Sequence, residues 1–99
     1  MNFSEKVWKA CAKVPRGRVT TYKEIARALR SKACRAVGNA LNKNPFAPRV
    51  PCHRVVNSDG KVGGYAHGQK KKIALLKKEG ITIKNGRITD FSKVFYKLR

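Results

Sequence analysis

Acidic residues are scarce in this sequence. It has 5 Asp and Glu against 24 Lys and Arg, which gives a formal net charge of +19 at pH 7 over 99 residues. An excess of one sign this large repels itself unless a polyanion neutralises it. Nucleic acid is therefore the leading partner class and an anionic membrane surface the second, and both rank above generic solubility as the reason for the charge.

Long apolar runs are also missing. No segment approaches the roughly 18 consecutive apolar residues that a membrane span needs. The first residues, Met1 to Glu5, lack the apolar core of a signal peptide. We therefore expect no membrane partner and an intracellular location, which is cytoplasmic, at the nucleoid in a prokaryote, or nuclear in a eukaryote.

Cysteine is present in a small, odd number. Cys11, Cys34 and Cys52 form no CxxC pair and have no zinc-finger spacing with histidine. A disulfide framework and a structural zinc site are therefore not predicted, and we expect no metal. Cys11 lies in an apolar pattern typical of core packing. Cys34 is expected to be buried in a helix, and Cys52 has a chemical context of its own.

The remaining composition indicates one domain. With 41% apolar residues, 99 residues can build one modest core but not two. Asn2 and Glu5 form a capping box, and apolar residues then recur at helical spacing as far as Val14. The spacing predicts a first helix that ends before Pro15.

The next segment has the pattern of a helix-turn-helix. Thr21 and Glu24 form a second capping box for a helix that ends near Arg30, and Ser31 can cap a third helix. The predicted buried stripe of that third helix is Ala33, Ala36, Val37, Ala40 and Leu41. An ordinary helical hairpin has the same pattern, and the charge of the whole chain favours the DNA-binding interpretation.

The second half predicts smaller elements. Three prolines between Asn44 and Pro51 predict a rigid extended loop. Residues 55–62 predict two short strands around a turn, and residues 63–68 a glycine-rich loop. A helix is expected over 69–78, with Ile73, Ala74 and Leu76 buried and Gly80 ending it; a hairpin about Asn85-Gly86 follows. The fold class is mainly α with small β elements.

Cys52 has the surroundings of a reactive thiol. A thiol reacts as its thiolate, which needs a base or a positive charge nearby, and His53 and Arg54 follow it directly. Adjacency in sequence alone is more often accidental than functional. The rigid approach through Pro51 and the basic helical pair upstream together favour a functional cysteine.

The segment Pro51-Cys52-His53-Arg54-Val55-Val56 resembles the active-site motif of the methylated-DNA–protein-cysteine methyltransferases, also called O(6)-alkylguanine-DNA alkyltransferases. The resemblance covers essentially the whole chain, because further elements follow in the family's order: Tyr22, Arg35-Ala36-Val37-Gly38, Asn44-Pro45, Gly60, Tyr65, Gly68 and Glu79-Gly80. It implies a winged helix-turn-helix-like DNA-binding domain over residues 1–99, without the N-terminal domain that the family usually carries.

The resemblance also implies a substrate and a way of reaching it. The domain would bind duplex DNA through the minor groove and turn an O(6)-alkylguanine out into a pocket beside Cys52. Arg35 would fill the space in the base stack, and Tyr22 would rotate the nucleotide out and contact the guanine. Tyr65 and the backbone around Val55 and Ala66 would line the pocket. The implied DNA-contacting residues are Tyr22, Lys23, Lys32, Arg35, Ala36, Gly38 and Ser58.

The implied reaction is DNA repair by direct reversal of damage. The Cys52 sulfur would take the alkyl group irreversibly, once per molecule, in a monomer without a cofactor. His53 would draw the thiol proton through a water, Glu79 would orient the imidazole, and Asn44 would brace the active-site loop. At Ala66 the family often has a hydroxyl residue, so a slower reaction or an altered preference among alkyl groups is expected.

Other interpretations remain open for the protein as a whole. One is an alkyltransferase-like sensor that recognises lesions without repairing them, although such proteins lack the cysteine. A second is a basic architectural DNA-binding protein, and a third, weaker one is a cysteine hydrolase. Apart from the resemblance, single residues have structural readings: Glu79 as a helix cap, Arg35 as a phosphate contact, Tyr22 as a core residue and Asn44 as a turn former.

Overall fold

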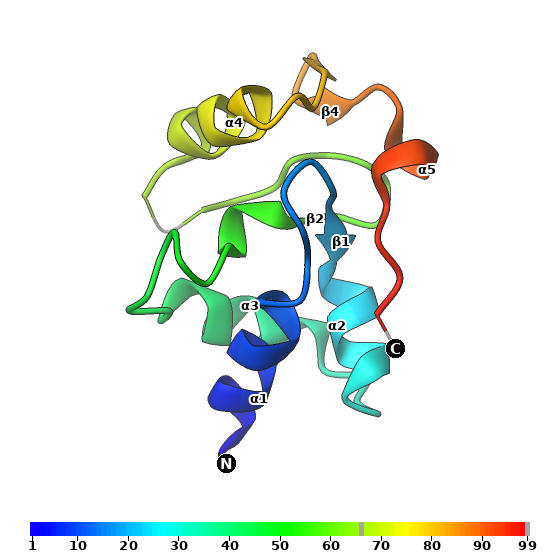
Figure 1. The fold of residues 1–99 in the computed structure, drawn as a ribbon. Helices are drawn as coiled ribbons and strands as arrows, with labels where there is room; N and C mark the ends of the chain where they lie inside the picture. Colours follow the sequence, from blue (N-terminus) through cyan, green and yellow to red (C-terminus); the bar gives the residue numbers. More distant parts are fainter. Residues whose placement is uncertain (66, 99) are drawn as a thin grey trace.

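Two tiers of helices meet at a short parallel strand pair in the computed structural model, which describes residues 1–65 and 67–98 (Figure 1). The lower tier holds the first three helices, and the upper tier holds a fourth helix and a hairpin. The elements in chain order are α1 (Phe3–Cys11), β1 (Thr20–Thr21), α2 (Tyr22–Ala28), α3 (Cys34–Asn42), the 3-10 turn η1 (Cys52–Arg54), β2 (Val55–Val56), α4 (Gln69–Lys78), β3 (Ile83–Lys84), β4 (Arg87–Ile88) and α5 (Phe91–Val94). The predicted fold class is confirmed.

The first two helices begin at the predicted caps. The Asn2 side chain accepts from Glu5 N at 2.9 Å and Glu5 Oε1 accepts from Asn2 N at 3.2 Å, so the first capping box is complete. Thr21 Oγ1 accepts from Glu24 N at 2.9 Å. The Glu24 carboxylate turns instead to Arg27 of the same helix and to the backbone N–H of Leu98 near the C-terminus. The second box is therefore only half formed.

The start of α3 differs from the prediction. Arg30 adopts a positive φ of 57°, which turns the chain away from α2, and α3 begins only at Cys34. Ser31 Oγ accepts from Ala33 N at 3.0 Å and does not cap the helix. Cys34 and Ala33 are exposed, because the buried stripe of α3 starts one turn later at Val37. The predictions of a Ser31 cap and a buried Cys34 were wrong.

The central strands pair across the chain. β1 pairs with β2 in parallel register, Thr20 with Val55 and Thr21 with Val56. Of the two short strands predicted over residues 55–62, only β2 forms: Asn57 N donates to Lys61 O at 2.9 Å across the turn, and Lys61 makes an isolated bridge with Arg87. The parallel pair instead joins the start of α2 to the segment that follows Cys52.

The upper tier agrees more closely with the elements that the sequence pattern predicts. α4 spans Gln69–Lys78 as predicted, and Gly80 ends it with φ 90°. β3 and β4 form the predicted antiparallel hairpin, with positive φ at Asn85 and Gly86. The inner face of α4 differs, because Lys72 is fully buried there beside Leu76 while Ala74 is exposed. The prediction that Ala74 is buried was wrong.

Each tier has its own apolar core. The lower cluster contains Val7, Ala10, Cys11, Val14, Ile25, Ala26, Val37, Ala40, Leu41, Cys52, Val55 and Leu98. The upper cluster contains Val19, Val56, Val62, Leu76, Ile81 and Ile88. The two valines of β2 face opposite ways and so join different clusters. Cys52 lies where the two tiers meet.

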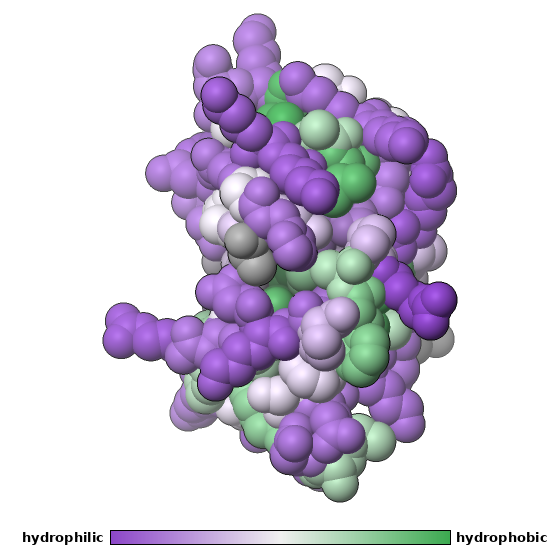
Figure 2. Space-filling model, turned by 90° about the vertical axis from the view of Figure 1, so that its left-hand side faces the viewer, coloured by the Kyte–Doolittle hydropathy of each residue, from purple (hydrophilic) through white to green (hydrophobic). Residues whose placement is uncertain are grey.

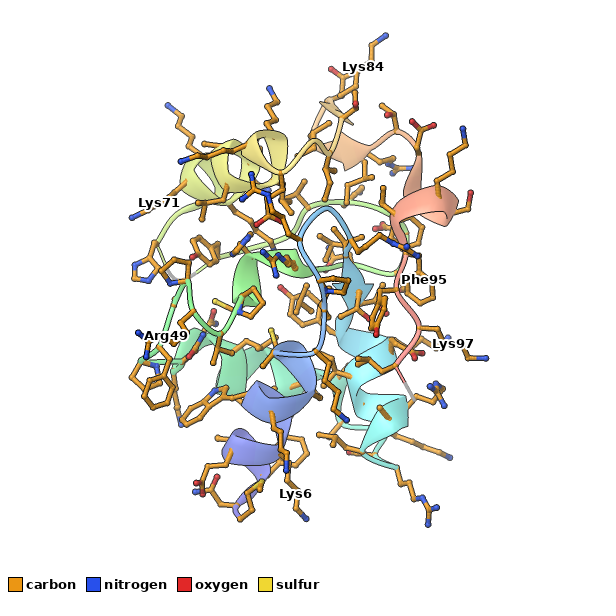
Figure 3. All side chains as sticks on the ribbon, viewed as in Figure 1. Lys6, Arg49, Lys71, Lys84, Phe95 and Lys97 are labelled. Atoms are coloured by element: carbon orange, nitrogen blue, oxygen red, sulfur yellow. The ribbon has the colours of Figure 1, made fainter. Side chains whose placement is uncertain are left out.

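The surface is dominated by basic side chains. Hydrophilic residues cover most of the face in Figure 2, and hydrophobic atoms show only in separate patches between them. Figure 3 shows labelled lysines extending outward from several parts of the molecule, including Lys6 on α1, Lys71 on α4, Lys84 on β3 and Lys97 near the C-terminus. Within residues 1–65 and 67–98, no helix combines the length and apolar character needed to cross a membrane.

Candidate active site and nucleic-acid interface

Cys52 opens the 3-10 turn η1 behind a braced loop. Its side chain is 6% exposed and packs in the lower cluster. Asn44 holds the approaching loop at two points: its Nδ2 donates to Val50 O at 2.9 Å, and its Oδ1 accepts from Phe46 N at 2.9 Å. The loop predicted to be rigid is therefore fastened through Asn44 to the end of α3.

His53 and Glu79 form a buried pair one residue beyond the thiol. His53 Nε2 and Glu79 Oε2 are 2.9 Å apart, and their side chains are 3% and 7% exposed. Burial lowers the pKa of His53, against the opposing effect of Glu79. For Glu79, burial works to raise the pKa, but hydrogen bonds from Arg54 and His53 outweigh it and bring the pKa to about 2. The pair at neutral pH is therefore an uncharged imidazole held by a carboxylate.

Arg54 also binds Glu79, which the sequence did not indicate. Its Nε donates to Glu79 Oε1 at 2.9 Å and its Nη2 to Oε2 at 2.8 Å, while its Nη1 donates to Val14 O at 2.8 Å. Adjacency to Cys52 suggested a direct charge effect on the thiol. The guanidinium instead hydrogen-bonds to the carboxylate of Glu79 at the end of α4.

Lys72 is a second residue that sequence reasoning missed. Its Nζ donates to Gly64 O at 2.9 Å and to the Tyr22 hydroxyl at 3.4 Å, and it lies 5.7 Å from the centre of the Tyr22 ring. Burial lowers the pKa of Lys72 to about 8 and raises the pKa of Tyr22. Lys72 is one of five lysines on α4, and nothing in the sequence indicated that it would be the one to point inward.

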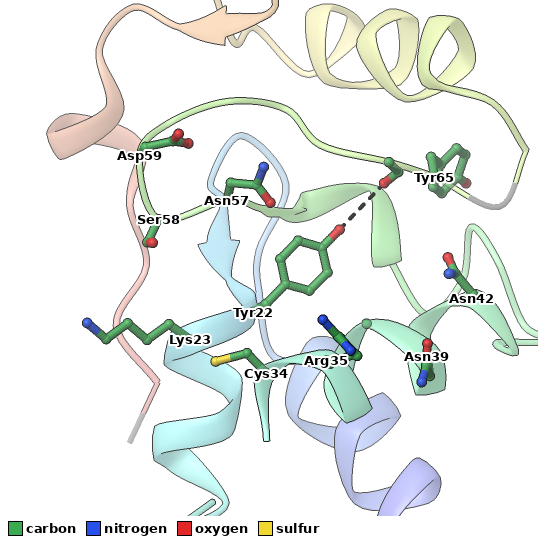
Figure 4. A pocket seen from close by; sticks show the side chains of 12 residues that line it. Tyr22, Lys23, Cys34, Arg35, Asn39, Asn42, Asn57, Ser58, Asp59 and Tyr65 are labelled. Carbon is green, nitrogen blue, oxygen red and sulfur yellow. Dashed lines mark hydrogen bonds between the residues drawn. The ribbon is translucent and has the colours of Figure 1, made fainter. Parts of the chain in front are cut away.

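A hollow of about 910 Å³ lies beside Tyr22, and we call it the Tyr22 hollow (Figure 4). Its lining comes from α2, α3 and the segment after β2: Tyr22, Lys23, Cys34, Arg35, Gly38, Asn39, Asn42, Asn57, Ser58, Asp59, Gly64 and Tyr65. Its size is in the range of pockets that hold small ligands. Polar, cationic and aromatic side chains thus surround a space large enough for a nucleotide.

The predicted site residues fall into three groups. The hollow brings together Tyr22, Lys23, Arg35, Gly38, Ser58 and Tyr65. Lys32 lines a neighbouring hollow under the helix turn, Ala36 is half-buried on α3, and Val55 is fully buried in β2. Ala66 lies outside the described residues. Sequence reasoning missed the asparagines Asn39, Asn42 and Asn57, whose only signal was their position on a polar helix face or in a turn.

The thiol lies behind the hollow and not on its wall. Tyr22 and Tyr65 belong to its lining and also pack against the cluster that contains Cys52. Burial, followed by the nearby Cys52, raises the pKa of Tyr65 to about 12, so its hydroxyl keeps its proton at neutral pH. Among the residues that the structure describes, no three His, Cys, Asp or Glu side chains gather as a metal site would require.

Comparisons with known proteins identify the family. The family model described as "6-O-methylguanine DNA methyltransferase, DNA binding domain" matches residues 2–81. A methylated-DNA–protein-cysteine methyltransferase of Methanosarcina barkeri is 52% identical over 79% of this chain and 50% of its own length. The chain spans about half the length of the curated relatives it matches.

Solved structures agree with this match. A crystal structure of Mycobacterium tuberculosis OGT in complex with DNA is 45% identical with a TM-score of 0.77, over 80% of this chain and 50% of that chain. One of S. pombe Atl1 in complex with damaged DNA containing O6-carboxymethylguanine is 31% identical with a TM-score of 0.84, over 96% of this chain and 94% of that chain. The chain belongs to the family of the 6-O-methylguanine DNA methyltransferase DNA-binding domain.

Proposed function

We propose that this protein repairs DNA by moving the alkyl group of an O(6)-alkylguanine onto Sγ of Cys52. The observation that carries the proposal is the buried His53–Glu79 pair, 2.9 Å between Nε2 and Oε2, directly after a cysteine behind a nucleotide-sized hollow. A thiol with a positioned imidazole can be deprotonated for nucleophilic attack. A sulfur nucleophile suits the soft alkyl carbon of the lesion.

The proposed step is an in-line displacement at the alkyl carbon. The Cys52 sulfur forms the new S–C bond while the O6–C bond breaks, and the electron pair of that bond stays with the guanine. His53 accepts the thiol proton, and the guanine takes up a proton as it leaves, so the net change is one thioether and one restored guanine. Because a thioether is a poor leaving group, each molecule acts once.

The substrate and partner follow from the surface and the relatives. The Tyr22 hollow combines Arg35 and Lys23 with two tyrosines, which suits a phosphate backbone and a base turned out of the stack. The relative from M. tuberculosis is an OGT crystallised with DNA, and S. pombe Atl1 was crystallised with DNA carrying O6-carboxymethylguanine. We propose duplex DNA with an O(6)-alkylguanine as the substrate, a monomer as the acting form, and a location where the cell keeps its DNA.

A lesion-binding role without transfer is the second candidate. It is supported by the likeness to Atl1, which extends over 94% of that chain. The His53–Glu79 pair beside Cys52 has no use in binding alone, so we place transfer first. The two candidates differ in whether the protein gains the mass of the alkyl group.

Cys52→Ser and Cys34→Ser make a matched pair for the test. Cys34 is exposed and lines the Tyr22 hollow, whereas Cys52 lies behind it. We expect Cys52→Ser to abolish transfer from a duplex with one O(6)-methylguanine while duplex affinity by fluorescence anisotropy stays within about twofold, because serine is close to cysteine in shape and slightly smaller, but its hydroxyl is a far weaker nucleophile. Cys34→Ser should transfer as the unchanged protein does.

The contrary results are equally specific. Loss of transfer in Cys34→Ser with retention in Cys52→Ser would assign the acceptor to the exposed cysteine. Equal loss of transfer and of duplex binding in a folded Cys52→Ser would remove its role as the acceptor.

A further inference from the structure

The Arg54 side chain joins three segments that are far apart in the sequence. It starts in η1, donates through Nη1 to Val14 O after α1, and donates through Nε and Nη2 to Glu79 at the end of α4. Its side chain is only 16% exposed. Such a placement desolvates the guanidinium, which the bidentate contact with the carboxylate offsets.

We propose that Arg54 is a positioning residue for alkyl transfer, which fixes the Glu79 carboxylate so that His53 donates from Nε2 and keeps Nδ1 as its proton acceptor. The proposal rests on the proposed function of Cys52 and deepens it. Arg54 acts through Glu79 and His53 and touches neither the thiol nor the substrate.

The contacts of the Glu79 carboxylate determine which nitrogen of His53 holds the hydrogen. Glu79 Oε2 receives Arg54 Nη2 at 2.8 Å and lies 2.9 Å from His53 Nε2, and Oε1 receives Arg54 Nε at 2.9 Å. A carboxylate has no proton to give, so His53 must donate from Nε2. In a neutral imidazole the lone pair is then on Nδ1. That atom is buried and hydrogen-bonds to no protein group among the described residues.

The charge of Arg54 also affects when His53 becomes protonated. Without the guanidinium, Glu79 would face the imidazole as an uncompensated anion and would favour the imidazolium, which cannot accept a proton. Arg54 lowers the pKa of His53, in addition to the larger effect of burial. Lys72 in α4 also lowers the pKa of His53, while Arg16 and Lys78 line the same recess of about 230 Å³.

Arg54→Met and Arg54→Lys test the proposal, with Arg16→Met as the matched control. Arg16 lies in the same recess but hydrogen-bonds to Lys78 O and not to Glu79. Two quantities are measured against pH: the rate of Cys52 alkylation by a duplex with one O(6)-methylguanine, and the ¹⁵N resonances of His53. The NMR signal reports tautomer and protonation whether or not transfer occurs.

We expect His53 in the unchanged protein to carry its hydrogen on Nε2. In Arg54→Met its titration, and the acid limb of the rate profile with it, should move up by roughly one pH unit. The rate at pH 7 should fall roughly tenfold, which is less than the about 10²–10⁴ that general-base catalysis supplies, because the less well oriented imidazole still accepts the proton. Arg54→Lys should show a smaller shift, because the charge stays while the bidentate contact is lost. Arg16→Met should leave both curves in place.

Two results would overturn the proposal. One is an Nδ1–H tautomer in the unchanged protein, which needs no variant and holds even if Arg54→Met fails to fold. The other is a folded Arg54→Met whose rate falls equally at every pH while His53 titrates as before, which would make Arg54 merely structural. A complete absence of transfer with the predicted tautomer and titration shift would instead contradict the proposed function, while the effect of Arg54 on the His53 tautomer and titration would stand.

Discussion

Lys72 is the clearest case of a single residue whose burial has a measurable cost. A lysine with no exposed surface loses the hydration of its ammonium, and the Gly64 carbonyl and Tyr22 hydroxyl replace only part of it. Lys72 lies against the ring of Tyr22, which lines the hollow. The same burial makes its protonation depend on folding.

Replacing Lys72 by Met should therefore change how stability depends on pH. Burial lowers the pKa of Lys72 from 10.5 to about 8, so between these values the unfolded chain binds a proton that the folded chain does not. The free energy of unfolding must then rise with pH across this window, by up to about 3 kcal/mol from this residue. Lys72→Met should lack that gain while remaining at least as stable at neutral pH.

Urea unfolding of both proteins at several pH values between about 8 and 10.5 measures the difference directly. Using the difference between the two curves removes the contribution of Tyr65, which also titrates at high pH and does not contact Lys72. Parallel curves would mean that Lys72 is not charged at a cost in the folded protein.

At the scale of elements, α3 presents the side chains that would meet DNA. Arg35 is exposed on its first turn and lines the Tyr22 hollow (Figure 4). If Arg35 fills the base stack after the nucleotide leaves, it offsets part of an unstacking cost of a few kcal/mol. A free base needs no such support.

Arg35→Ala should therefore slow transfer from duplex DNA by roughly 10- to 100-fold, yet change the reaction with free O(6)-alkylguanine base by less than about twofold. Arg87→Ala, which removes an exposed arginine on β4 outside the hollow, serves as the control and should leave both rates nearly unchanged. Rates come from the alkylated fraction of the protein over time. Equal slowing on both substrates would argue against a role in nucleotide flipping.

The elements that the sequence predicts well are those set by neighbours in the chain. The hairpin follows from Asn85-Gly86, where both residues take positive φ, and α1 follows from the Asn2–Glu5 capping box. The pairing of Thr20–Thr21 with β2 joins residues far apart in the sequence, and a two-residue strand has no pattern of its own. Its partner could not be predicted from local pattern.

In the candidate site, too, some residues could be predicted from the sequence and others depend on long-range contacts. The resemblance around Cys52 indicates His53, Glu79 and Asn44, and the structure brings His53 and Glu79 into contact and ties Asn44 to the loop. Arg54 and Lys72 were missed, because each is one of many basic residues and their partners are distant in the sequence. Long-range contacts, not residue type, determine which lysine or arginine turns inward.

At the scale of the whole molecule, the net charge of +19 governs how the protein meets a polyanion. Few acids are available to neutralise it: Glu24 and Glu79 are already paired with arginines inside the fold. A protein that neutralises six to ten phosphates loses about 10³–10⁵ in affinity between roughly 50 and 200 mM salt. The same counterion release should dominate binding to undamaged duplex.

We therefore expect the affinity for an undamaged duplex to fall steeply with salt, with a slope of log K against log salt of about −5 or steeper. Replacing both Lys23 and Lys32 by Met, next to the Tyr22 hollow, should reduce the slope by about 2, one for each lost phosphate contact. Replacing both Lys70 and Lys71 on α4 makes the same charge change elsewhere and should leave it nearly unchanged. Equal effects of the two pairs would mean that binding has no preferred face.

Alkylation of Cys52 is tested most directly by intact-protein mass spectrometry after incubation with a duplex that carries one O(6)-methylguanine, followed by peptide mapping. We predict the mass of a single methyl group on every reacted molecule, located on Cys52, and an equal amount of restored guanine in the DNA. An unchanged protein mass despite tight binding to the lesion would contradict transfer and would leave lesion recognition as the function.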